Sequence, residues 1–336
     1  MRLLEMSGAF PDRIRALGYA YREAKALLSA VELGVFTALA DGPLDLGTLT
    51  NRTRIDQRGA RDFFDALVAL GLLHRDDSGR YACTGETGLY LDDRKPTYLG
   101  GEIEFNVQLY ARWNLLTRVL KTGKPAAGKG NYQALYADPE AVGVFARGMS
   151  AATLPVAIAI AGNVPWAKYQ TVIDIGSAQG CLPVQLARVH EHLTGGGFDV
   201  PPMKSVFDRY VEEHGLSRRL RFYSGDFFED QLPSADVLVM GRVLHNWNLG
   251  TKKKLLQKAY DALPAGGALI VYERLIDDAR VINATSLLDS LNMLVMTEGG
   301  FGFTGADCIG WMRETGFRDM RVEHLTNDQS MIIGEK

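Results

Sequence analysis

The first half of the chain places hydrophobic residues at the three- and four-residue spacing of amphipathic helices. The clearest run starts near residue 12, where Ile14, Leu17, Tyr21 and Leu28 fall on one face before Gly34. The same pattern predicts helices over residues 12–33, 35–40, 46–51, 57–70, 101–120 and 138–161. This half is therefore expected to be mainly helical.

A β-hairpin is predicted from two short extended runs, 72–75 and 80–83, on either side of an Asp-Asp-Ser-Gly turn. Helices followed by a hairpin have the order of a winged helix, which raises the possibility of DNA binding. The candidate recognition helix, 56–70, has charged residues of both signs, namely Arg58, Arg61, Asp56, Asp62 and Asp65. Such a helix has no net positive charge for phosphates. A structural or dimer-forming winged helix is the favoured interpretation.

After Trp166 short apolar runs alternate with helical ones. Strands are predicted at 171–175, at a run that ends in Asp199, and at 220–224, 237–240 and 267–273. Helices are predicted around Pro183, up to about His214 and over 252–263, and the chain closes with a helix near 306–316 and β runs at 317–325 and 329–333. This alternation is typical of a doubly wound parallel sheet with helices on both faces. We therefore predict two domains, 1–163 and 164–336.

Composition is that of an ordinary globular protein, with 336 residues, 46% hydrophobic and 23% charged. This excludes the disordered and fibrous classes. The formal charge of −3 opposes nucleic acid as a partner. The uncharged stretch 148–167 contains Pro155, Gly162, Asn163 and Pro165, so it is interpreted as a buried helix and a turn, with no membrane partner.

The N-terminal residues and the cysteines both bear on where in the cell the protein is found. Residues 1–13 contain Glu5 and no long apolar core, so no signal peptide is expected. The three cysteines, Cys83, Cys181 and Cys308, are far apart and show no metal-binding spacing. A reduced, cytoplasmic protein is predicted. His190 and His192 do not face one another on a helix, and no metal site is predicted.

Candidate chemistry begins at the sequence VIDIGSAQG, 172–180, which ends a strand and opens a helix. In open parallel sheets, ligands bind beyond the carboxyl ends of strands, and Gly176 and Gly180 allow the backbone to approach one closely. Asp199 follows Gly176 by roughly 20 residues, where an acid can bind ribose hydroxyls. Asp226 follows the third strand and can accept an adenine amino hydrogen, with Phe227 covering the ring. Each acid alone could be a helix cap or a solvated loop residue, but together they favour a nucleoside site.

An ordered set of motifs now resembles a known family: VIDIGSAQG, GFD, GDFFE, GRVLHNWN, LPAGGALIVYE and LNMLVMTEGG, with AVELGVFTAL and ALVALGLL in the first half. The chain resembles, over nearly its whole length, the S-adenosylmethionine-dependent O-methyltransferases of the plant caffeate and bacterial polyketide type. The resemblance implies a Rossmann-like catalytic domain and an N-terminal winged-helix domain that forms a homodimer and contributes to the acceptor pocket.

The resemblance also implies roles for residues. S-adenosylmethionine, which leaves as S-adenosylhomocysteine, would be bound by Asp174, Gly176, Ser177, Gly180, Asp199, Asp226, Phe227 and Arg242. His245 takes the position of the general base, with Asn246 beside it. The acceptor would lie against Met149, Asn292, Met293 and Met296. A phenol has a pKa near ~10, so a nearby imidazole suits removal of its proton at neutral pH.

Some positions depart from the family pattern. Ser177 and Ala178 replace two glycines, and Asn246 stands where Asp is common. Gly302 occupies the position of a second acidic residue, for which Glu298 is the nearest substitute, and Gly241 replaces the lysine of plant members. These departures affect the expected roles of individual residues, but they leave the resemblance to the family intact.

The predicted function is methyl transfer from S-adenosylmethionine to a hydroxyl of an aromatic secondary metabolite. Two alternatives stay open: a cofactor-binding relative with hydroxylase or decarboxylase activity, and a DNA-binding regulator that senses a metabolite. N- or C-methylation also stays open. Without the resemblance, His245 could equally be a structural histidine. Trp247 is expected to be a packing residue, and the run Lys252–Lys254 a solvated helix face.

Overall fold

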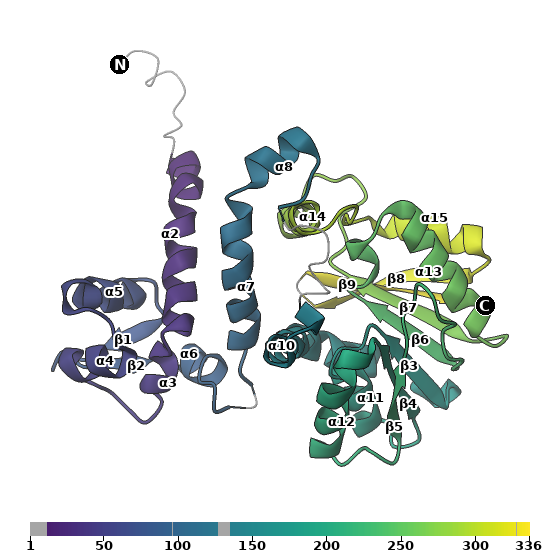
Figure 1. Ribbon diagram of the computed structural model, residues 1–336, viewed down its shortest axis with the longest axis horizontal. Helices are drawn as coiled ribbons and strands as arrows, with labels where there is room; N and C mark the ends of the chain where they lie inside the picture. Colours follow the sequence, from purple (N-terminus) through teal and green to yellow (C-terminus); the bar gives the residue numbers. More distant parts are fainter. Residues whose placement is uncertain (1–11, 96, 127–134, 327) are drawn as a thin grey trace. The chain divides into compact units, whose positions relative to one another are not determined.

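The computed structural model describes residues 12–95, 97–126, 135–326 and 328–336 (Figure 1). Residues 1–11, on which the expectation of no signal peptide largely rests, lie outside the described part. Residues 127–131 of the Gly/Lys/Pro-rich segment 121–131 also lie outside it. The chain forms two compact units, one ending at Val107 and the other comprising Gln108–Lys336. Each is described by itself.

The first unit is helical with one hairpin, in the predicted order. Its helices are α2 (Asp12–Glu32), α3 (Val35–Ala38), α4 (Leu46–Thr53), α5 (Gln57–Ala69) and α6 (Gly85–Tyr90), and its hairpin pairs β1 (Leu73–Arg75) with β2 (Tyr81–Cys83). Gly34 separates α2 from α3 with a φ of 65°, which favours glycine. The fully buried side chains of Phe36, Leu49, Phe64 and Leu67 form the core of this unit.

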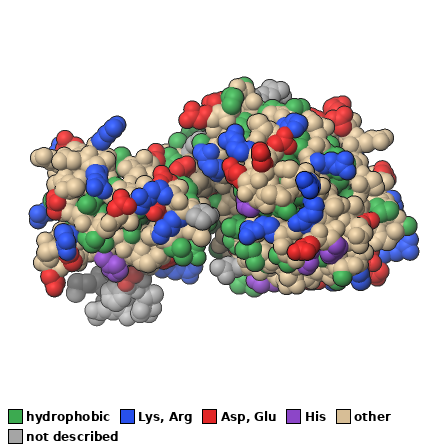
Figure 2. All heavy atoms as spheres, turned by 90° about the horizontal axis from the view of Figure 1, so that it is seen from below, with side chains coloured by type: hydrophobic (Ala, Val, Ile, Leu, Met, Phe, Trp, Pro, Cys, Tyr) green, Lys and Arg blue, Asp and Glu red, His purple; other side chains and the backbone are tan. Residues whose placement is uncertain are grey.

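Charges of both signs cover this unit. On the face shown in Figure 2, acidic and basic side chains are interspersed. Asp65 of α5, the predicted recognition helix, pairs with Arg75 and accepts a hydrogen bond of 2.7 Å from the Tyr81 hydroxyl. One acid of that helix therefore fastens α5 to the hairpin.

The second unit contains a seven-stranded sheet in the order β5-β4-β3-β6-β7-β9-β8. The strands are β3 (Thr171–Ile175), β4 (Thr194–Asp199), β5 (Leu220–Ser224), β6 (Val237–Gly241), β7 (Ala268–Glu273), β8 (Arg318–Thr326) and β9 (Gln329–Glu335). The first five strands in this order are parallel, and β9 and β8 join antiparallel. The chain runs outward in one direction from β3 to β5, then returns to place β6 on the other side of β3. This reversal is the point where open α/β sheets bind ligands.

Helices cover both faces of this sheet (Figure 1). They are α10 (Pro139–Asn163), α11 (Cys181–Val189), α12 (Lys204–Glu213), α13 (Leu249–Ala262) and α15 (Gly305–Thr315). The unit also contains α8 (Leu116–Thr122) and α14 (Ala284–Met296), which pack against one another, while α7 (Gly100–Trp113) crosses the division between the units. The predicted α/β class with a helical N-terminal unit is confirmed. The predicted continuous helix over 101–120 is wrong, because the chain turns at Asn114 and Leu115, and α6 is a helix that the hydrophobic pattern does not predict.

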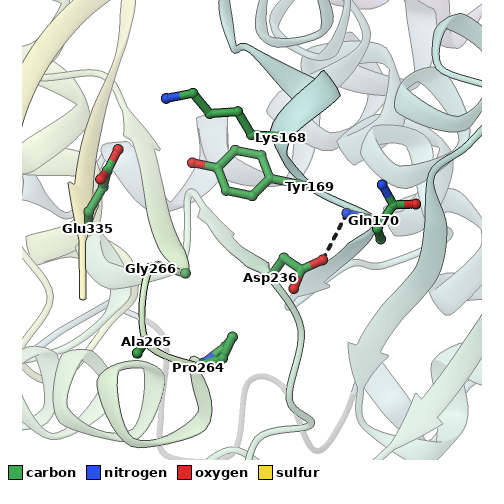
Figure 3. Close-up of a pocket in the computed structure, with 9 residues that line it drawn as sticks. Lys168, Tyr169, Gln170, Asp236, Pro264, Ala265, Gly266 and Glu335 are labelled. Atoms are coloured by element: carbon green, nitrogen blue, oxygen red, sulfur yellow. Dashed lines mark hydrogen bonds between the residues drawn. The ribbon is translucent and has the colours of Figure 1, made fainter.

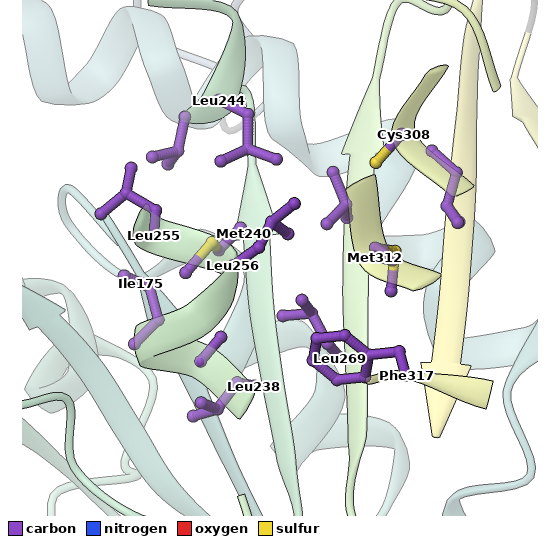
Figure 4. Close-up of a cluster of buried hydrophobic side chains, with 14 of the residues drawn as sticks. Ile175, Leu238, Met240, Leu244, Leu255, Leu256, Leu269, Cys308, Met312 and Phe317 are labelled. Atoms are coloured by element: carbon purple, nitrogen blue, oxygen red, sulfur yellow. The ribbon is translucent and has the colours of Figure 1, made fainter. Parts of the chain in front are cut away.

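Successive strand residues point to opposite faces, and the two cores follow that alternation. Ile173 and Ile175 of β3 pack with α13 and α15 in the cluster of Figure 4, whereas Val172 packs with α10 and α11. A strand buried on both faces must be apolar throughout, which explains the uninterrupted hydrophobic runs in β6 and β7.

Helix α10 belongs to the second core. It is the one helix among the described residues that is long and apolar enough to cross a membrane by length and composition. Its Val156, Ala157 and Ile160 side chains are buried against the sheet unit, as expected for a core helix. Because α10 packs on α11, the compact units divide at 107/108, earlier than the expected boundary at 163/164.

Candidate active site

The predicted cofactor residues follow the carboxyl ends of four adjacent parallel strands. Gly176 follows β3, Asp199 ends β4, Asp226 comes after β5 and Arg242 after β6. In the sheet register, Ile175 lies between Phe198 and Met240, so these ends meet at one edge. The sheet itself therefore brings together side chains from distant parts of the sequence.

The turn 176–180 has a backbone that side chains rarely allow. Gly176, Ala178 and Gly180 have φ values of 77°, 47° and 86°. A Cβ on Gly176 would lie 2.8 Å from Val243, and one on Gly180 would lie 2.5 Å from Phe207. Both glycines are thus required by close contacts, whereas Ala178 holds a left-handed conformation despite its methyl group.

Asp199 is fastened to this turn. Its Oδ2 accepts a hydrogen bond of 2.8 Å from the Ala178 N–H, and its Oδ1 accepts one of 2.7 Å from the Val200 N–H. Burial raises the pKa of Asp199 to about 6, although both N–H donors oppose the shift. A carboxylate has about four acceptor positions, so each oxygen can still accept from a ligand.

Asp174 and Ser177 lie buried beside the same turn. Burial, with the nearby charge of Asp199, raises the pKa of Asp174 well above its usual range. Ser177 packs where a Cβ on Gly197 would come within 2.1 Å of its Oγ. That Oγ has no hydrogen-bond partner among the described residues. Unsatisfied buried polar atoms are uncommon, and this one borders the predicted ligand turn.

Asp226 and Phe227 form a rigid corner. The Asp226 Oδ1 accepts from the Phe228 N–H, and the Asp226 N–H donates to Asp230, both across 2.8 Å. The Phe227 ring stands nearly perpendicular to the Trp247 ring, with centroids 5.9 Å apart. Trp247 therefore packs against this corner, in agreement with its predicted structural role.

A sharp turn carries His245. Arg242 has a φ of 54° and donates from its N–H to the Tyr272 carbonyl. The Asn246 side-chain amide donates to the carbonyls of Arg242 and Val243, at 3.0 and 3.3 Å. These bonds hold the short 3-10 turn η3 (Leu244–Asn246), on which the imidazole is carried.

Glu273, at the end of β7, is the partner of His245. The His245 Nδ1 lies 2.8 Å from Glu273 Oε2, which is ion-pair distance, although the ring N–H does not point along this line. The His245 main-chain N–H donates to Oε1 across 3.2 Å. Both side chains are more than nine-tenths buried. The sequence reasoning missed Glu273, although its place at the end of a parallel strand is a signal that could have found it.

A second carboxylate lies farther from the imidazole. Asp289 of α14 comes within 4.0 Å of the His245 Nδ1 and is paired with Arg274. At Gly302 a side chain would be crowded, since a Cβ there would lie 3.0 Å from Ser290. Glu298, the substitute suggested by the sequence, is exposed. Asp289 is thus the second acid near His245.

The predicted acceptor residues divide between α10 and α14. On α14, the Asn292 Oδ1 accepts a hydrogen bond of 2.9 Å from the Trp113 indole, and Met293 is buried. The Met296 sulfur lies 3.4 Å from an Arg112 nitrogen. Met149 is half-buried on α10. Helix α14 packs against η3, so its side chains approach the His245 turn.

Two positions correct or explain the sequence analysis. Lys252 is completely buried, so the expected solvated face is wrong for this lysine, while Lys254 is exposed. Gly241, which replaces the lysine of plant members, is needed because a Cβ there would lie 1.8 Å from the Tyr272 ring. The large tyrosine occupies the space of a side chain at 241.

A separate cavity of about 380 Å³ lies at the opposite edge of the sheet (Figure 3). Its lining includes Tyr169 and Asp236, which precede β3 and β6, and Glu335 at the end of antiparallel β9. These are the amino ends of the parallel strands, so this cavity is remote from the predicted site. Within the described ranges, no three His, Cys, Asp or Glu side chains gather as a metal site.

Residues 113–318 match the model of the O-methyltransferase domain, and residues 16–93 match that of the O-methyltransferase dimerisation domain. The chain belongs to the O-methyltransferase family. A relative from Streptomyces glaucescens, the tetracenomycin polyketide synthesis 8-O-methyl transferase TcmO, is 41% identical over 97% of each chain. The N,N-dimethyltransferase OxyT of Streptomyces rimosus is 37% identical over 92% of this chain and 91% of its own.

A solved methyltransferase structure shares the fold of this chain. The crystal structure of human N-acetylserotonin methyltransferase in complex with SAM has a TM-score of 0.90, at 24% identity and 97% coverage of each chain. The family resemblance, the predicted enzyme class and the dimerisation domain are thereby confirmed. The roles of individual site residues remain predictions.

Proposed function

We propose that this protein transfers a methyl group from S-adenosylmethionine to a hydroxyl of an aromatic secondary metabolite, with His245 as general base. The observation that carries this proposal is the buried His245–Glu273 pair at the same sheet edge as Asp199 and the 176–180 turn. The name of the relative TcmO, a polyketide O-methyl transferase, supports the reaction and the polyketide type of acceptor.

The residues at the strand ends fit the donor. Asp199 has acceptor positions left for the ribose hydroxyls, and Asp226 can accept the adenine amino group beside the Phe227 ring. Gly176 and Gly180, with Ser177 and its unpartnered Oγ, would lie along the methionine portion. S-adenosylmethionine supplies a methyl group already activated by its sulfonium. Asp174 is buried near the end of β3, two residues before Gly176.

The work left to the protein is to align the acceptor oxygen and remove its proton. The His245 Nδ1 lies at ion-pair distance from Glu273, so we assign the other ring nitrogen, Nε2, to the acceptor hydroxyl. As the proton arrives, the carboxylate of Glu273 stabilises the imidazolium. Asn246 holds the turn that carries the ring. Base catalysis of this kind contributes about 10²–10⁴-fold in rate.

The acceptor would lie beside α14, between Met293, Met296 and Asn292, and near Met149 of α10. Thioether side chains adapt to flat apolar rings, and the Asn292 amide, held by Trp113, offers its N–H groups to a polar substituent. The two relatives methylate different atoms by name, oxygen in TcmO and nitrogen in OxyT. We choose oxygen because the family match is to O-methyltransferases.

The dimerisation domain supports a homodimer as the working form. Helix α2 exposes Ile14, Leu17, Tyr19 and Tyr21, all at least half exposed in the single chain. Large apolar side chains on one helix are typical of a surface that is covered by a partner. We propose that a second copy of the chain covers them, in a cytoplasmic enzyme.

The test is incubation with labelled S-adenosylmethionine and a panel of polycyclic phenols, followed by mass spectrometry. We expect a product that has gained one methyl group on oxygen. His245→Ala should bind the donor normally by calorimetry and lose about 100-fold or more in turnover. His324→Ala, at an exposed histidine, is the matched control. Unchanged turnover in His245→Ala would overturn the role of the base, and oxygenated or decarboxylated products would favour the alternative activity.

A further inference from the structure

Lys252 is a buried cation that the proposed reaction does not yet use. Its residue exposure is 0%, and it lies in the first turn of α13. This position is doubly costly, because burial removes water from the ammonium and the N-terminus of a helix already carries partial positive charge. Burial lowers the pKa of Lys252 to about 8, with the charge of Glu273 opposing the shift. The ammonium is therefore mainly charged at neutral pH.

The contacts of Lys252 join two segments that are far apart in the sequence. Its Nζ donates to the Trp247 carbonyl across 2.6 Å and to the Phe301 carbonyl across 3.0 Å. It also lies 3.3 Å from the centroid of the Phe301 ring. Trp247 ends the turn of His245, and Phe301 belongs to the segment that follows α14. The lysine thus fastens the base turn to the end of the acceptor helix.

Two glycines make this junction tight. A Cβ on Gly300 would lie 2.6 Å from the His245 carbonyl oxygen, and one on Gly299 would lie 3.0 Å from Asn248. The two backbones can approach this closely only without side chains. A cation between their carbonyls then replaces the water that these acceptors would otherwise need.

Glu273 connects Lys252 with the base, because its charge interacts with Lys252 and it is paired with His245. The electrostatic partners of Lys252 are Glu273 on β7 and Cys308 on α15, and burial keeps the Cys308 thiol neutral by raising its pKa. The groups that face His245 are Glu273 and Asp289, the latter paired with Arg274. Lys252 is therefore a buried positive charge that interacts with Glu273, the carboxylate paired with His245.

We propose that Lys252 is a positioning residue for methyl transfer, which fixes the His245 turn against the segment after α14 and whose charge opposes protonation of the imidazole. This inference rests on the proposed role of His245 as base. A purely structural lysine would affect stability and turnover, but it would not move the pH dependence of the reaction. That difference makes the role testable.

The experiment compares Lys252→Met, Lys252→Gln and the control Lys254→Met, on the same helix. Loss of a nearby positive charge eases protonation of His245, so the acidic limb of kcat/KM should move to higher pH by about 0.5 unit or more in both Lys252 variants. Lys252→Met should lower kcat about tenfold. Lys252→Gln keeps a donor for the carbonyls, so its kcat should recover in part. Lys254→Met should behave as the parent protein.

Calorimetry of donor binding and thermal unfolding show which variants are folded. If Lys252→Met does not fold, the pH dependence is measured on Lys252→Gln alone. An acidic limb that stays in place in a folded Lys252 variant would overturn the inference. His245→Ala separates this failure from that of the proposed function. If His245→Ala is active, the base assignment fails, whereas an inactive His245→Ala with an unmoved limb in Lys252→Gln removes only the role of Lys252.

Discussion

The Ala178 main-chain N–H donates to the Asp199 carboxylate across 2.8 Å, and it does so from a left-handed backbone with a φ of 47°. One hydrogen bond thus connects the turn after β3 with the end of β4. The conformation that aims the N–H is one that glycine adopts freely and alanine does not. A glycine at position 178 would reach this geometry without that strain.

Ala178→Gly should therefore leave stability unchanged or raise it by up to about 1.5 kcal/mol. Relief of left-handed strain, roughly 1–2 kcal/mol, exceeds the entropy that glycine adds to the unfolded chain, about 0.4–1 kcal/mol. Ala178→Val should cost about 2 kcal/mol or more and weaken donor binding, because a β-branched residue resists this φ. Urea unfolding and calorimetry measure both effects.

Ala265→Gly is the matched control, because Ala265 lies in a loop without a positive φ. There the same exchange adds entropy to the unfolded chain and relieves no strain, so it should destabilise by about 0.4–1 kcal/mol. Equal losses at 178 and 265 would contradict the account of strain at Ala178.

Asp199→Asn should weaken donor binding, because its amide nitrogen cannot accept the main-chain hydrogen bond that one carboxylate oxygen accepts from Ala178 or Val200, and it should abolish the pH dependence of stability that this carboxyl causes. The pKa of Asp199, about 6 in the fold, lies above its value of roughly 3.9 in the unfolded chain. Between these values the folded state binds more protons, so the contribution of this group to stability declines as pH rises toward 6. The charged carboxylate of Asp199 thus lowers stability, but we propose that the protein needs it to bind the donor.

In the parent protein, titration of Asp199 should also change the donor affinity. This affinity should fall as the pH drops below about 6 and the Asp199 carboxyl is protonated. Calorimetry from about pH 5 to about pH 8 measures the donor affinity of the parent protein and of Asp199→Asn, with neutral pH as the reference. The affinity of Asp199→Asn should be nearly flat over the range. A parallel decline in both proteins would show that another group titrates.

The homodimer is tested on α2. Ile14→Asp with Leu17→Asp places two charges where the side chains are 75% and 69% exposed in the single chain. If a second copy covers them, the double variant should elute as a monomer by size-exclusion chromatography with light scattering, because unpaired buried charges oppose association. Asp77→Lys in the hairpin turn is the control. A double variant that stays dimeric would place the interface elsewhere.

Much of the fold follows from periodicity, because strands buried on both faces are apolar throughout and helices on a sheet are amphipathic. Residues 171–175 are predicted and observed as β3 with the same bounds. Helix α6 has only six residues and depends on the Thr84 capping box, so it carries no helical repeat. The break at Asn114 and Leu115 lies inside a continuous helical pattern and depends on tertiary packing.

The site shows the same limit. Asp199 and Asp226 stand at or just after strand ends, where the order of elements predicts ligand-binding acids, whereas the role of His245 is predicted from the family resemblance. Glu273 also ends a strand, but its pairing with His245 and the burial of Lys252 depend on contacts in space. Lys252 lies in a run of three lysines, and only the carbonyls of Trp247 and Phe301, brought to it by the fold, explain why it is buried. A linear pattern contains no information on such partners.

Glu273→Gln provides the opposite test to that of Lys252. It removes the negative charge 2.8 Å from the His245 Nδ1 and keeps the shape and an acceptor oxygen. Protonation of the imidazole becomes harder, so the acidic limb of kcat/KM should move to lower pH, whereas the Lys252 variants move it to higher pH.

Turnover of Glu273→Gln should fall by about 10- to 100-fold, because the imidazolium formed on proton transfer loses its counter-charge, while donor affinity should stay unchanged. Glu314→Gln, at an exposed glutamate paired with Lys253, is the control. Since Glu273 also accepts from the His245 main-chain N–H, loss of donor affinity or of the folded state would indicate that it holds the turn rather than the charge. Opposite shifts in the two sets of variants would place His245 between a carboxylate that favours its protonation and an ammonium that opposes it.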